Sequence, residues 1–134
     1  SGMRLDLGGI AKGYILQQAL SALAAHGVTR ALLEAGGDIV VGDAPPGKTG
    51  WRIDVPHADR TFAARAAALV RAALATSGAT SQFVEIDGVR YSHVIDPRTG
   101  VGITSDVVTS VIAPDGATSP TYTSVAGSSR WFTM

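Results

Sequence analysis

Apolar residues recur at helical spacing soon after the start of the chain. The positions are Leu16, Ala19, Leu20, Leu23 and Ala24, and their spacing is that of one face of an amphipathic helix. Gly27 suits the end of this helix, because glycine readily adopts the left-handed conformation found there. The pattern predicts a helix over about residues 10–26, with His26 in its last turn as a structural residue.

A second stretch with helical spacing is "RTFAARAAALVRAALA", residues 60–75. Its apolar positions are Phe62, Ala66, Leu69, Val70, Ala73 and Leu74. We expect most of the arginines of this stretch to face solvent; they are Arg60, Arg65 and Arg71. This distribution predicts a second amphipathic helix.

Strand patterns occupy much of the remaining chain. "ALLEA" (31–35) and "DIVVGD" (38–43) are typical of short strands separated by Gly36-Gly37. "WRIDVP" (51–56) alternates until Pro56 ends the strand. A surface turn is predicted for "APPGKTG" (44–50), and a final strand for "VVTSVIA" (107–113).

The clearest local prediction is a hairpin in "SQFVEIDGVRYSHVID", residues 81–96. Asp87-Gly88 is a strong signal for a two-residue turn between alternating segments. The cross-strand pairs expected from this turn are Ile86–Val89, Glu85–Arg90, Val84–Tyr91 and Gln82–His93. One face of the hairpin would then be apolar and the other would carry an ion pair.

The order of these elements mixes helices and strands without strict βαβ alternation. It favours an α+β fold with a largely antiparallel sheet covered by helices. The chain has 134 residues, of which 46% are hydrophobic, and this is enough for one domain with a real core.

Composition excludes several classes of function. Eleven basic residues balance eleven acidic ones, so the overall charge does not favour nucleic acid or an anionic membrane as a partner. The sequence has no cysteines, which excludes disulfides, thiolate nucleophiles and cysteine metal ligands. No apolar stretch approaches the roughly 20 residues needed to cross a bilayer.

Candidate chemistry gathers in four polar segments that contain glycine. They are "DLGGIAKG" (6–13), "EAGGD" (34–38), "TSGATS" (76–81) and "SHVIDPRTG" (92–100). Each lies at the end of a predicted strand or helix, so we expect the fold to bring them to one edge. Lys12, Arg98 and bare backbone N–H groups could then hold a polyphosphate, beside hydroxyls at Ser77 and Ser92 and an imidazole at His93.

None of these segments is decisive alone. A P-loop needs Ser or Thr after its lysine, a Rossmann fingerprint needs GxGxxG, and the segment around Lys12 has neither. Gly8-Gly9 could equally serve only tight packing where a helix begins. His93 alone is typical of a satisfied core residue, and residues 96–100 alone are typical of an ordinary turn.

Together, however, the segments carry a resemblance. "LDLGGIAKGY", "LLEAGGDI", "ATSG", "IDGVRYSHVIDPRTG" and "SVIAPD", in this order and spacing, resemble the ApbE-type flavin transferase family over residues 3 to about 115. The resemblance implies a T-fold-like ApbE domain that uses FAD as substrate and Mg²⁺ as cofactor. The implied reaction cleaves FAD, attaches FMN to a Thr or Ser hydroxyl of an acceptor protein, and releases AMP.

The resemblance also implies roles for residues of this chain. The FAD-binding set would be Asp6, Gly9, Lys12, Gly36, Gly37, Ser77, Gly78, Ser92, His93 and Arg98. The catalytic candidates are His93, for proton handling near the reacting phosphate, and Asp96, which would help to shape the pocket. The metal would be held by the backbone carbonyl of Ala35 and by Ser124, at a position where the family has Thr.

The chain departs from the family pattern near its C-terminus. "ATSPTYTSVAG" stands where typical members have a helix reading roughly ADALATAL, so Pro120 replaces an Asp metal ligand. Losing a carboxylate should weaken a magnesium site severely, although Asp115 is a candidate substitute. We therefore expect a divergent tail over 116–134, in a chain corresponding to the C-terminal half of the usual family length.

Three functions stay open at this point. They are an FAD:protein FMN transferase, a degenerate FAD-binding or partner-binding module without transfer, and an FAD pyrophosphatase. The expected partner of a transferase is an acceptor flavoprotein with a Thr/Ser flavinylation motif, and a homodimer is also compatible with the sequence. The resemblance implies a periplasmic or membrane-anchored lipoprotein, while a cytoplasmic location stays open.

Overall fold

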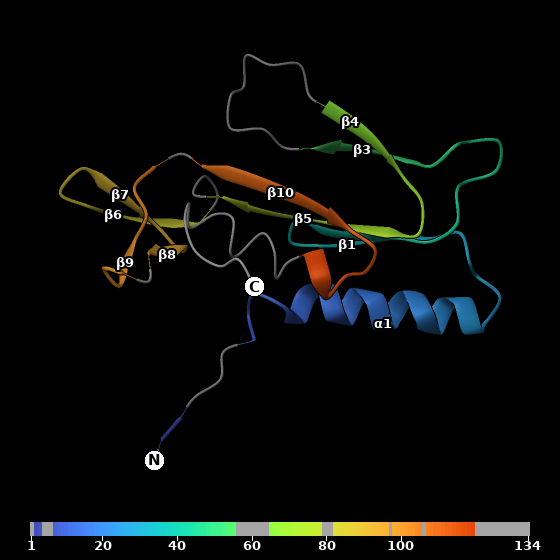
Figure 1. The fold of residues 1–134 in the computed structure, drawn as a ribbon, viewed down its shortest axis with the longest axis horizontal. Helices are drawn as coiled ribbons and strands as arrows, with labels where there is room; N and C mark the ends of the chain where they lie inside the picture. Colours follow the sequence, from blue (N-terminus) through green and yellow to red (C-terminus); the bar gives the residue numbers. More distant parts are fainter. Residues whose placement is uncertain are drawn as a thin grey trace.

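The computed structural model describes residues 2–3, 7–55, 65–78, 82–96, 98–105 and 107–119. Strands are the most frequent elements in these ranges (Figure 1). The elements are α1 (Ala11–Ala25), β1 (Leu32–Ala35), β2 (Asp38–Val41), β3 (Trp51–Val55), β4 (Arg65–Leu69), β5 (Ala72–Gly78), β6 (Phe83–Ile86), β7 (Val89–Ser92), β8 (Ile95–Asp96), β9 (Val101–Gly102) and β10 (Val108–Ala113).

The central feature is a four-stranded antiparallel sheet in the order β1-β2-β5-β10. In Figure 1, α1 runs along one face of this sheet and the β3-β4 pair lies over the other. The β6-β7 and β8-β9 hairpins extend beyond one end of the sheet. The predicted α+β fold with a largely antiparallel sheet is therefore confirmed, with α1 as its covering helix in the described part of the chain.

The core has two parts, because β2 and β5 send alternate side chains to the two covered faces. One cluster, shared with α1, consists of Leu16, Leu20, Val40 and Ala73. The other, shared with β3 and β4, consists of Val41, Ile53, Leu69 and Leu74. Full burial of a side chain such as valine or leucine stabilises a fold by roughly 1.5–3 kcal/mol. Both central strands therefore need apolar residues at consecutive positions.

The helix predicted over 10–26 is confirmed as α1, Ala11–Ala25. Its buried residues are Gly13, Leu16 and Leu20. Gly116 has no room for a side chain, because a Cβ built on it would clash with the Gly13 carbonyl oxygen. The turn after β10 therefore packs directly on the helix backbone. His26 is the C-cap residue, and its backbone N–H donates to the carbonyls of the last turn.

The helix predicted over 60–75 is wrong in its described part. Residues 65–69 and 72–78 form β4 and β5, while residues 60–64 lie outside the described ranges. Val70-Arg71 is a two-residue turn in which Arg71 has a φ of 46°. This turn joins two sheets, because β4 pairs with β3 whereas β5 pairs with β2 and β10. Leu69 and Leu74 then pack together in the core between the two sheets. This packing outweighs the high intrinsic helix propensity of the alanines.

Two turns predicted from glycine form between antiparallel strands. Gly36 and Gly37, with φ of 55° and 91°, connect β1 to β2. Asp87 and Gly88, with φ of 51° and 76°, connect β6 to β7. Positive φ at both central residues is the requirement of a type I′ turn, which explains why glycine is used.

The predicted register of the β6-β7 hairpin is also confirmed. The observed pairs include Ile86–Val89, Glu85–Arg90 and Val84–Tyr91. The backbone N–H of His93 donates to the Gln82 carbonyl at 3.2 Å, which extends the pairing beyond the strands.

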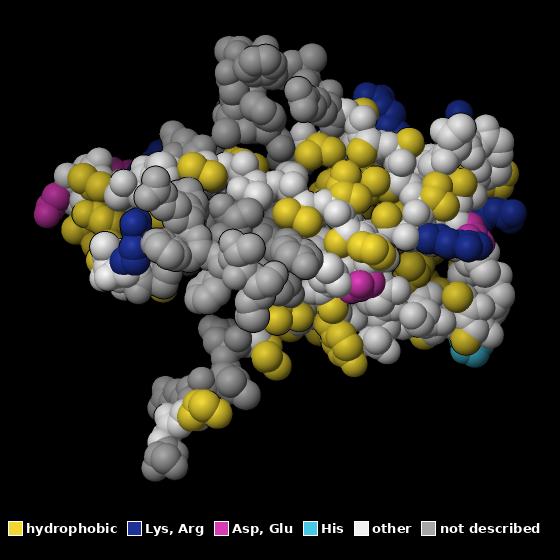
Figure 2. Space-filling view, viewed as in Figure 1, with side chains coloured by type: hydrophobic (Ala, Val, Ile, Leu, Met, Phe, Trp, Pro, Cys, Tyr) yellow, Lys and Arg dark blue, Asp and Glu magenta, His cyan; other side chains and the backbone are white. Residues whose placement is uncertain are grey.

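The two faces of this hairpin have different chemistry. The apolar face stays exposed, with Val84 at 55% and Ile86 at 54% of full exposure. In Figure 2, apolar side chains gather at the left end of the molecule, where Figure 1 shows β6 and β7. On the other face, the Arg90 guanidinium lies 4.4 Å from the centre of the Phe83 ring and 3.6 Å from the Glu85 carboxylate.

The remaining strand predictions agree with β1, β2, β3 and β10. Trp51 is half-buried, and its Nε1 donates to the Asp43 carbonyl at 3.0 Å. Pro56, His57 and Trp131 lie outside the described residues. Over the part of the chain that is described, no helix has the length and apolar character to span a membrane.

We expect Leu74→Ala to lower the free energy of unfolding by roughly 2–5 kcal/mol, because it leaves a cavity in a packed core. Leu74 is only 1% exposed. Its cross-strand partner Ile112 is 49% exposed, so Ile112→Ala should cost about 1 kcal/mol or less. Urea denaturation measures both values, and equal losses would contradict this account of the core.

Candidate functional site

Residues from all four glycine-containing segments line one pocket of about 510 Å³. The lining residues are Gly8, Gly9, Lys12, Gly36, Asp38, Thr76, Ser77, Gln82, His93, Val94 and Ile95. The expected convergence of these segments is therefore observed, and most of the lining is polar or glycine.

Strand register explains why distant segments meet here. Ile39 of β2 pairs with Leu74 of the antiparallel β5. If the same register continues, Ser77 at the end of β5 lies opposite Gly36 in the β1-β2 turn. The first turn of α1, with Lys12, packs against the same end, so three separate segments form one rim.

Lys12 is the cation of the pocket. Its Nζ donates to the Gly36 carbonyl at 3.1 Å and lies 3.5 Å from Oδ2 of Asp38. The first turn of α1 contains no acidic residue, so the partial positive charge of the helix N-terminus is not neutralised from within that turn. An anionic group is therefore favoured at this rim.

Asp38 is the buried acid of the pocket, with 6% of its surface exposed. Burial raises the pKa of its carboxyl, the Lys12 ammonium lowers it, and the Glu34 carboxylate raises it further; the net direction is upward. The charged form of Asp38 consequently depends on Lys12 remaining close.

His93 lies at the boundary of two pockets. It lines the polar pocket and also an apolar groove of about 430 Å³ beside the exposed face of β6-β7. Its ring Nδ1 is 3.2 Å from the Gln82 carbonyl oxygen. A carbonyl can only accept a hydrogen bond, so Nδ1 carries the proton in the neutral ring and Nε2 keeps a lone pair. This tautomer suits a general base.

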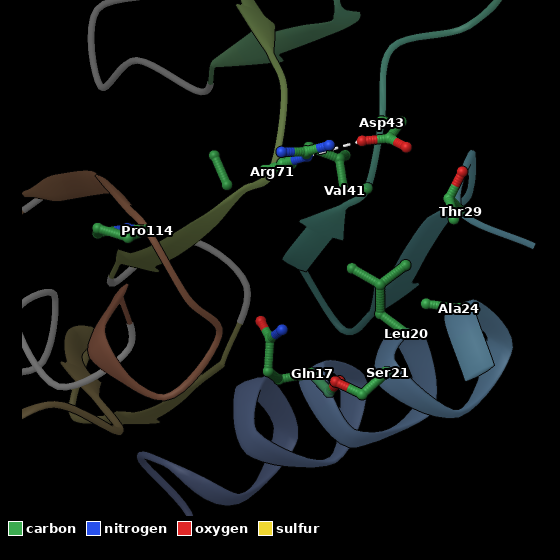
Figure 3. Close-up of a pocket in the computed structure, with 11 residues that line it drawn as sticks. Gln17, Leu20, Ser21, Ala24, Thr29, Val41, Asp43, Arg71 and Pro114 are labelled. Carbon is green, nitrogen blue, oxygen red and sulfur yellow. Dashed lines mark hydrogen bonds and ion pairs between the residues drawn. The ribbon is translucent and has the colours of Figure 1, made fainter.

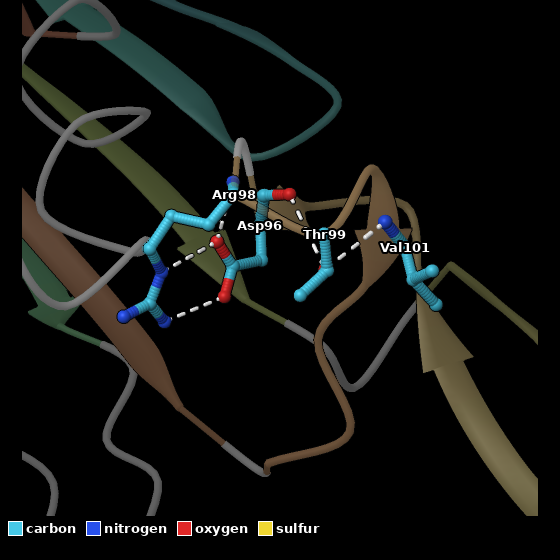
Figure 4. Close-up of polar contacts among 4 residues, drawn as sticks. All are labelled: Asp96, Arg98, Thr99 and Val101. Atoms are coloured by element: carbon cyan, nitrogen blue, oxygen red, sulfur yellow. Dashed lines mark hydrogen bonds and ion pairs between the residues drawn. The ribbon is translucent and has the colours of Figure 1, made fainter.

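Asp96 and Arg98 pair with each other in the turn between β8 and β9 (Figure 4). Arg98 Nε and Nη2 donate to the two Asp96 oxygens at 3.0 and 2.6 Å, and the Arg98 backbone N–H adds a bond at 2.9 Å. Hydrogen bonds from Arg98 lower the pKa of Asp96 to about 2. The phosphate-binding role of Arg98 and the catalytic role of Asp96 stay predictions, and the geometry shows a charge pair that stabilises the turn.

Other predicted residues border the pocket without lining it. Gly37 completes the β1-β2 turn, and Ala35 ends β1. A Cβ on Gly78 would lie 3.0 Å from Cγ2 of Val108, so a larger residue would push β10 away. The buried Ser92 hydroxyl accepts the N–H bond of the residue two positions on, at 3.1 Å. Asp6, Pro120 and Ser124 lie outside the described residues.

The magnesium site that the resemblance implies stays a prediction, because Ser124 lies outside the described residues. Over the described ranges, no group of three or more His, Asp or Glu side chains is arranged to hold a metal ion. Asp115 instead caps a short turn, accepting bonds from the backbone N–H groups of Ala117 and Thr118 and from the Thr118 hydroxyl. These bonds lower the pKa of Asp115.

Three polar side chains that line the pocket were not among the predicted site residues: Asp38, Thr76 and Gln82. A signal existed for Asp38, because an acid directly before the apolar run of β2 is unusual for a buried strand. Thr76 and Gln82 carry no comparable signal, since their positions follow from strand pairing.

A second pocket, of about 270 Å³, lies at the opposite end of β2 (Figure 3). Arg71 and Asp43 pair at 2.7 Å on its rim, and Leu20 and Val41 lie deeper. None of the four glycine-containing segments lines it, so this second pocket contains none of the candidate chemistry.

Comparison with known proteins identifies the family. The model of the ApbE family matches residues 1–129. The chain belongs to the ApbE family. The crystal structure of an ApbE protein from Thermotoga maritima MSB8 superposes with a TM-score of 0.84 and 32% identity, over 93% of this chain and 41% of that one. The fold described above is thus that of part of an ApbE protein.

Two curated ApbE relatives carry the name FAD:protein FMN transferase. The protein of Treponema pallidum (strain Nichols) is 37% identical over 125 residues, which is 85% of this chain and 34% of the relative. The protein of Rhodobacter capsulatus is 37% identical over 134 residues, which is 96% of this chain and 25% of the relative. This chain therefore spans about a quarter to a third of the length of these relatives.

We expect Arg98→Ala to return the pKa of Asp96 from about 2 towards its ordinary value of about 3.9. Because the pKa of Asp96 is lower in the folded chain than in the unfolded chain, ionised Asp96 stabilises the turn at pH values above its unfolded-state pKa. This stabilisation is lost as the pH falls through about 2. Carbon-13 NMR of the aspartate carboxyls follows this titration, with Asp115 as the control. An unchanged Asp96 titration in Arg98→Ala would contradict the assignment.

Proposed function

We infer that this chain forms the FAD-binding part of an FAD:protein FMN transferase. The supporting observation is a polar pocket in which Lys12, the Gly36 turn, Ser77 and His93 come together. Family membership narrows the anion that this pocket would take to a flavin dinucleotide. Lys12 and the N-terminus of α1 supply the positive charge that a diphosphate needs.

The proposed reaction is a phosphoryl transfer. The hydroxyl oxygen of an acceptor Thr or Ser forms a bond to the FMN-side phosphorus, and the bond between that phosphorus and the bridging oxygen breaks. AMP leaves with the bridging oxygen and its electron pair. His93 would take the hydroxyl proton on Nε2, because its Nδ1 is held by Gln82. Lys12 would offset the negative charge of the diphosphate.

Mg²⁺ dependence belongs to this proposal through the family resemblance. The ligand positions suggested by that resemblance include Pro120, which has no side-chain oxygen, and Ser124. This departure favours a second candidate, a module that binds FAD and has lost transfer. The reaction steps proposed above therefore involve only His93 and Lys12, whose side chains line the pocket.

Three outcomes separate these candidates when the chain is incubated with FAD, Mg²⁺ and a peptide bearing an acceptor Thr. An FMN–peptide adduct with AMP, detected by mass spectrometry, supports the transferase. AMP and FMN without an adduct would indicate a pyrophosphatase, and FAD binding without either product would indicate a binding module. Absence of FAD binding would overturn all three.

Where transfer occurs, His93→Ala should lower kcat by about 10²–10⁴-fold, because it removes the proposed general base. His26→Ala is the matched control, since His26 caps α1 and contributes nothing to the pocket. Steady-state rates of AMP release measure both variants. Equal rates for His93→Ala and the parent chain would remove His93 from the mechanism.

A further inference from the structure

We propose that Asp38 is a positioning residue, which fixes the ammonium of Lys12 at the rim of the pocket. Its effect on FAD rests on the proposed function, whereas its effect on Lys12 does not. Asp38 belongs to neither the FAD-binding nor the catalytic set that the sequence suggested.

The geometry makes Lys12 a bridge between two elements. The side chain leaves the first turn of α1 and reaches the β1-β2 turn, where Nζ donates to the Gly36 carbonyl at 3.1 Å and faces Asp38 Oδ2 at 3.5 Å. An ammonium has three N–H donors. These two contacts fix its position while leaving donor capacity for a ligand in the pocket.

The two partners differ in burial, and this difference assigns their roles. The Lys12 side chain is 49% exposed, and that of Asp38 is 8% exposed. A half-exposed lysine would otherwise sample many rotamers and lose that freedom on binding a ligand. A carboxylate that β2 already holds in place can restrict the lysine before the ligand arrives, which is preorganisation.

Glu34, the neighbouring acidic residue, has a different structural role. The Glu34 side chain accepts the backbone N–H of Gly37 at 2.9 Å, which closes the β1-β2 turn. Glu34 therefore shapes the turn that presents the Gly36 carbonyl. Within the described residues, Asp38 is the carboxylate that forms an ion pair with Lys12.

A purely structural role for Asp38 makes a different prediction. A buried acid that only satisfies its own surroundings would affect stability when replaced, without changing Lys12 reactivity or ligand affinity. An acid that positions Lys12 must change both, and its effect on affinity must vanish when Lys12 is absent.

The first test measures Lys12 without any ligand. Lys12 and Lys48 are the two lysines of the sequence, and Lys48 lies exposed in a surface turn. Under limiting acetic anhydride, peptide mass spectrometry gives the ratio of Lys12 to Lys48 acetylation. We expect Lys12 to react several-fold more slowly in the parent chain, and the ratio to rise in Asp38→Asn. Equal reactivity in the parent chain overturns the proposal, even if Asp38→Asn does not fold.

The second test is a double-mutant cycle on FAD affinity, measured by calorimetry. Asp38→Asn should weaken FAD binding roughly tenfold in the parent background. In a Lys12→Met background it should change the Kd by less than about twofold. Asp43→Asn, which breaks the distant pair with Arg71, is the matched control and should leave the Kd unchanged.

The outcomes separate this inference from the proposed function. If the parent chain does not bind FAD, the proposed function fails, and lysine acetylation still decides whether Asp38 positions Lys12. Unchanged or tighter FAD binding by Asp38→Asn overturns the inference, as does the same loss of affinity in the Lys12→Met background.

Discussion

Burial on both faces of β2 and β5 is the constraint on which the rest of the structure depends. Val40 and Val41 are consecutive in β2, yet they enter different core clusters on opposite sides of the sheet. Ala73 and Leu74 do the same in β5. A slip of one residue in either strand would exchange the two faces. The helix and the β3-β4 pair therefore fix the register from both sides.

That register is also what assembles the site. With Ile39 opposite Leu74, the β1-β2 turn and the end of β5 must lie at the same end of the sheet. α1 packs on the same strands, and its first turn brings Lys12 to Gly36 and Asp38. The stability of the core and the geometry of the pocket thus have a common cause.

The sequence predicted those elements whose signals are local. The glycine turns at 36–37 and 87–88 need positive φ, and both formed as predicted. The pattern around Leu69 and Leu74 suited a helix, but these residues belong to strands of two different sheets, and they meet beside Ile53 in the core between those sheets. Asp38 was missed as a site residue for a related reason, since its environment is set by β5 and α1 rather than by its neighbours in sequence.

Amide chemical-shift mapping on addition of FAD tests the central claim most directly. If distant segments close around one dinucleotide, the backbone amides of Gly9, Gly36 and Ser77 should shift together with one common Kd. The amide chemical shifts of Ser21 and Gly42, which line the pocket at the other end of β2, should not change. Shifts confined to Ser21 and Gly42, or no shifts at all, would contradict the account.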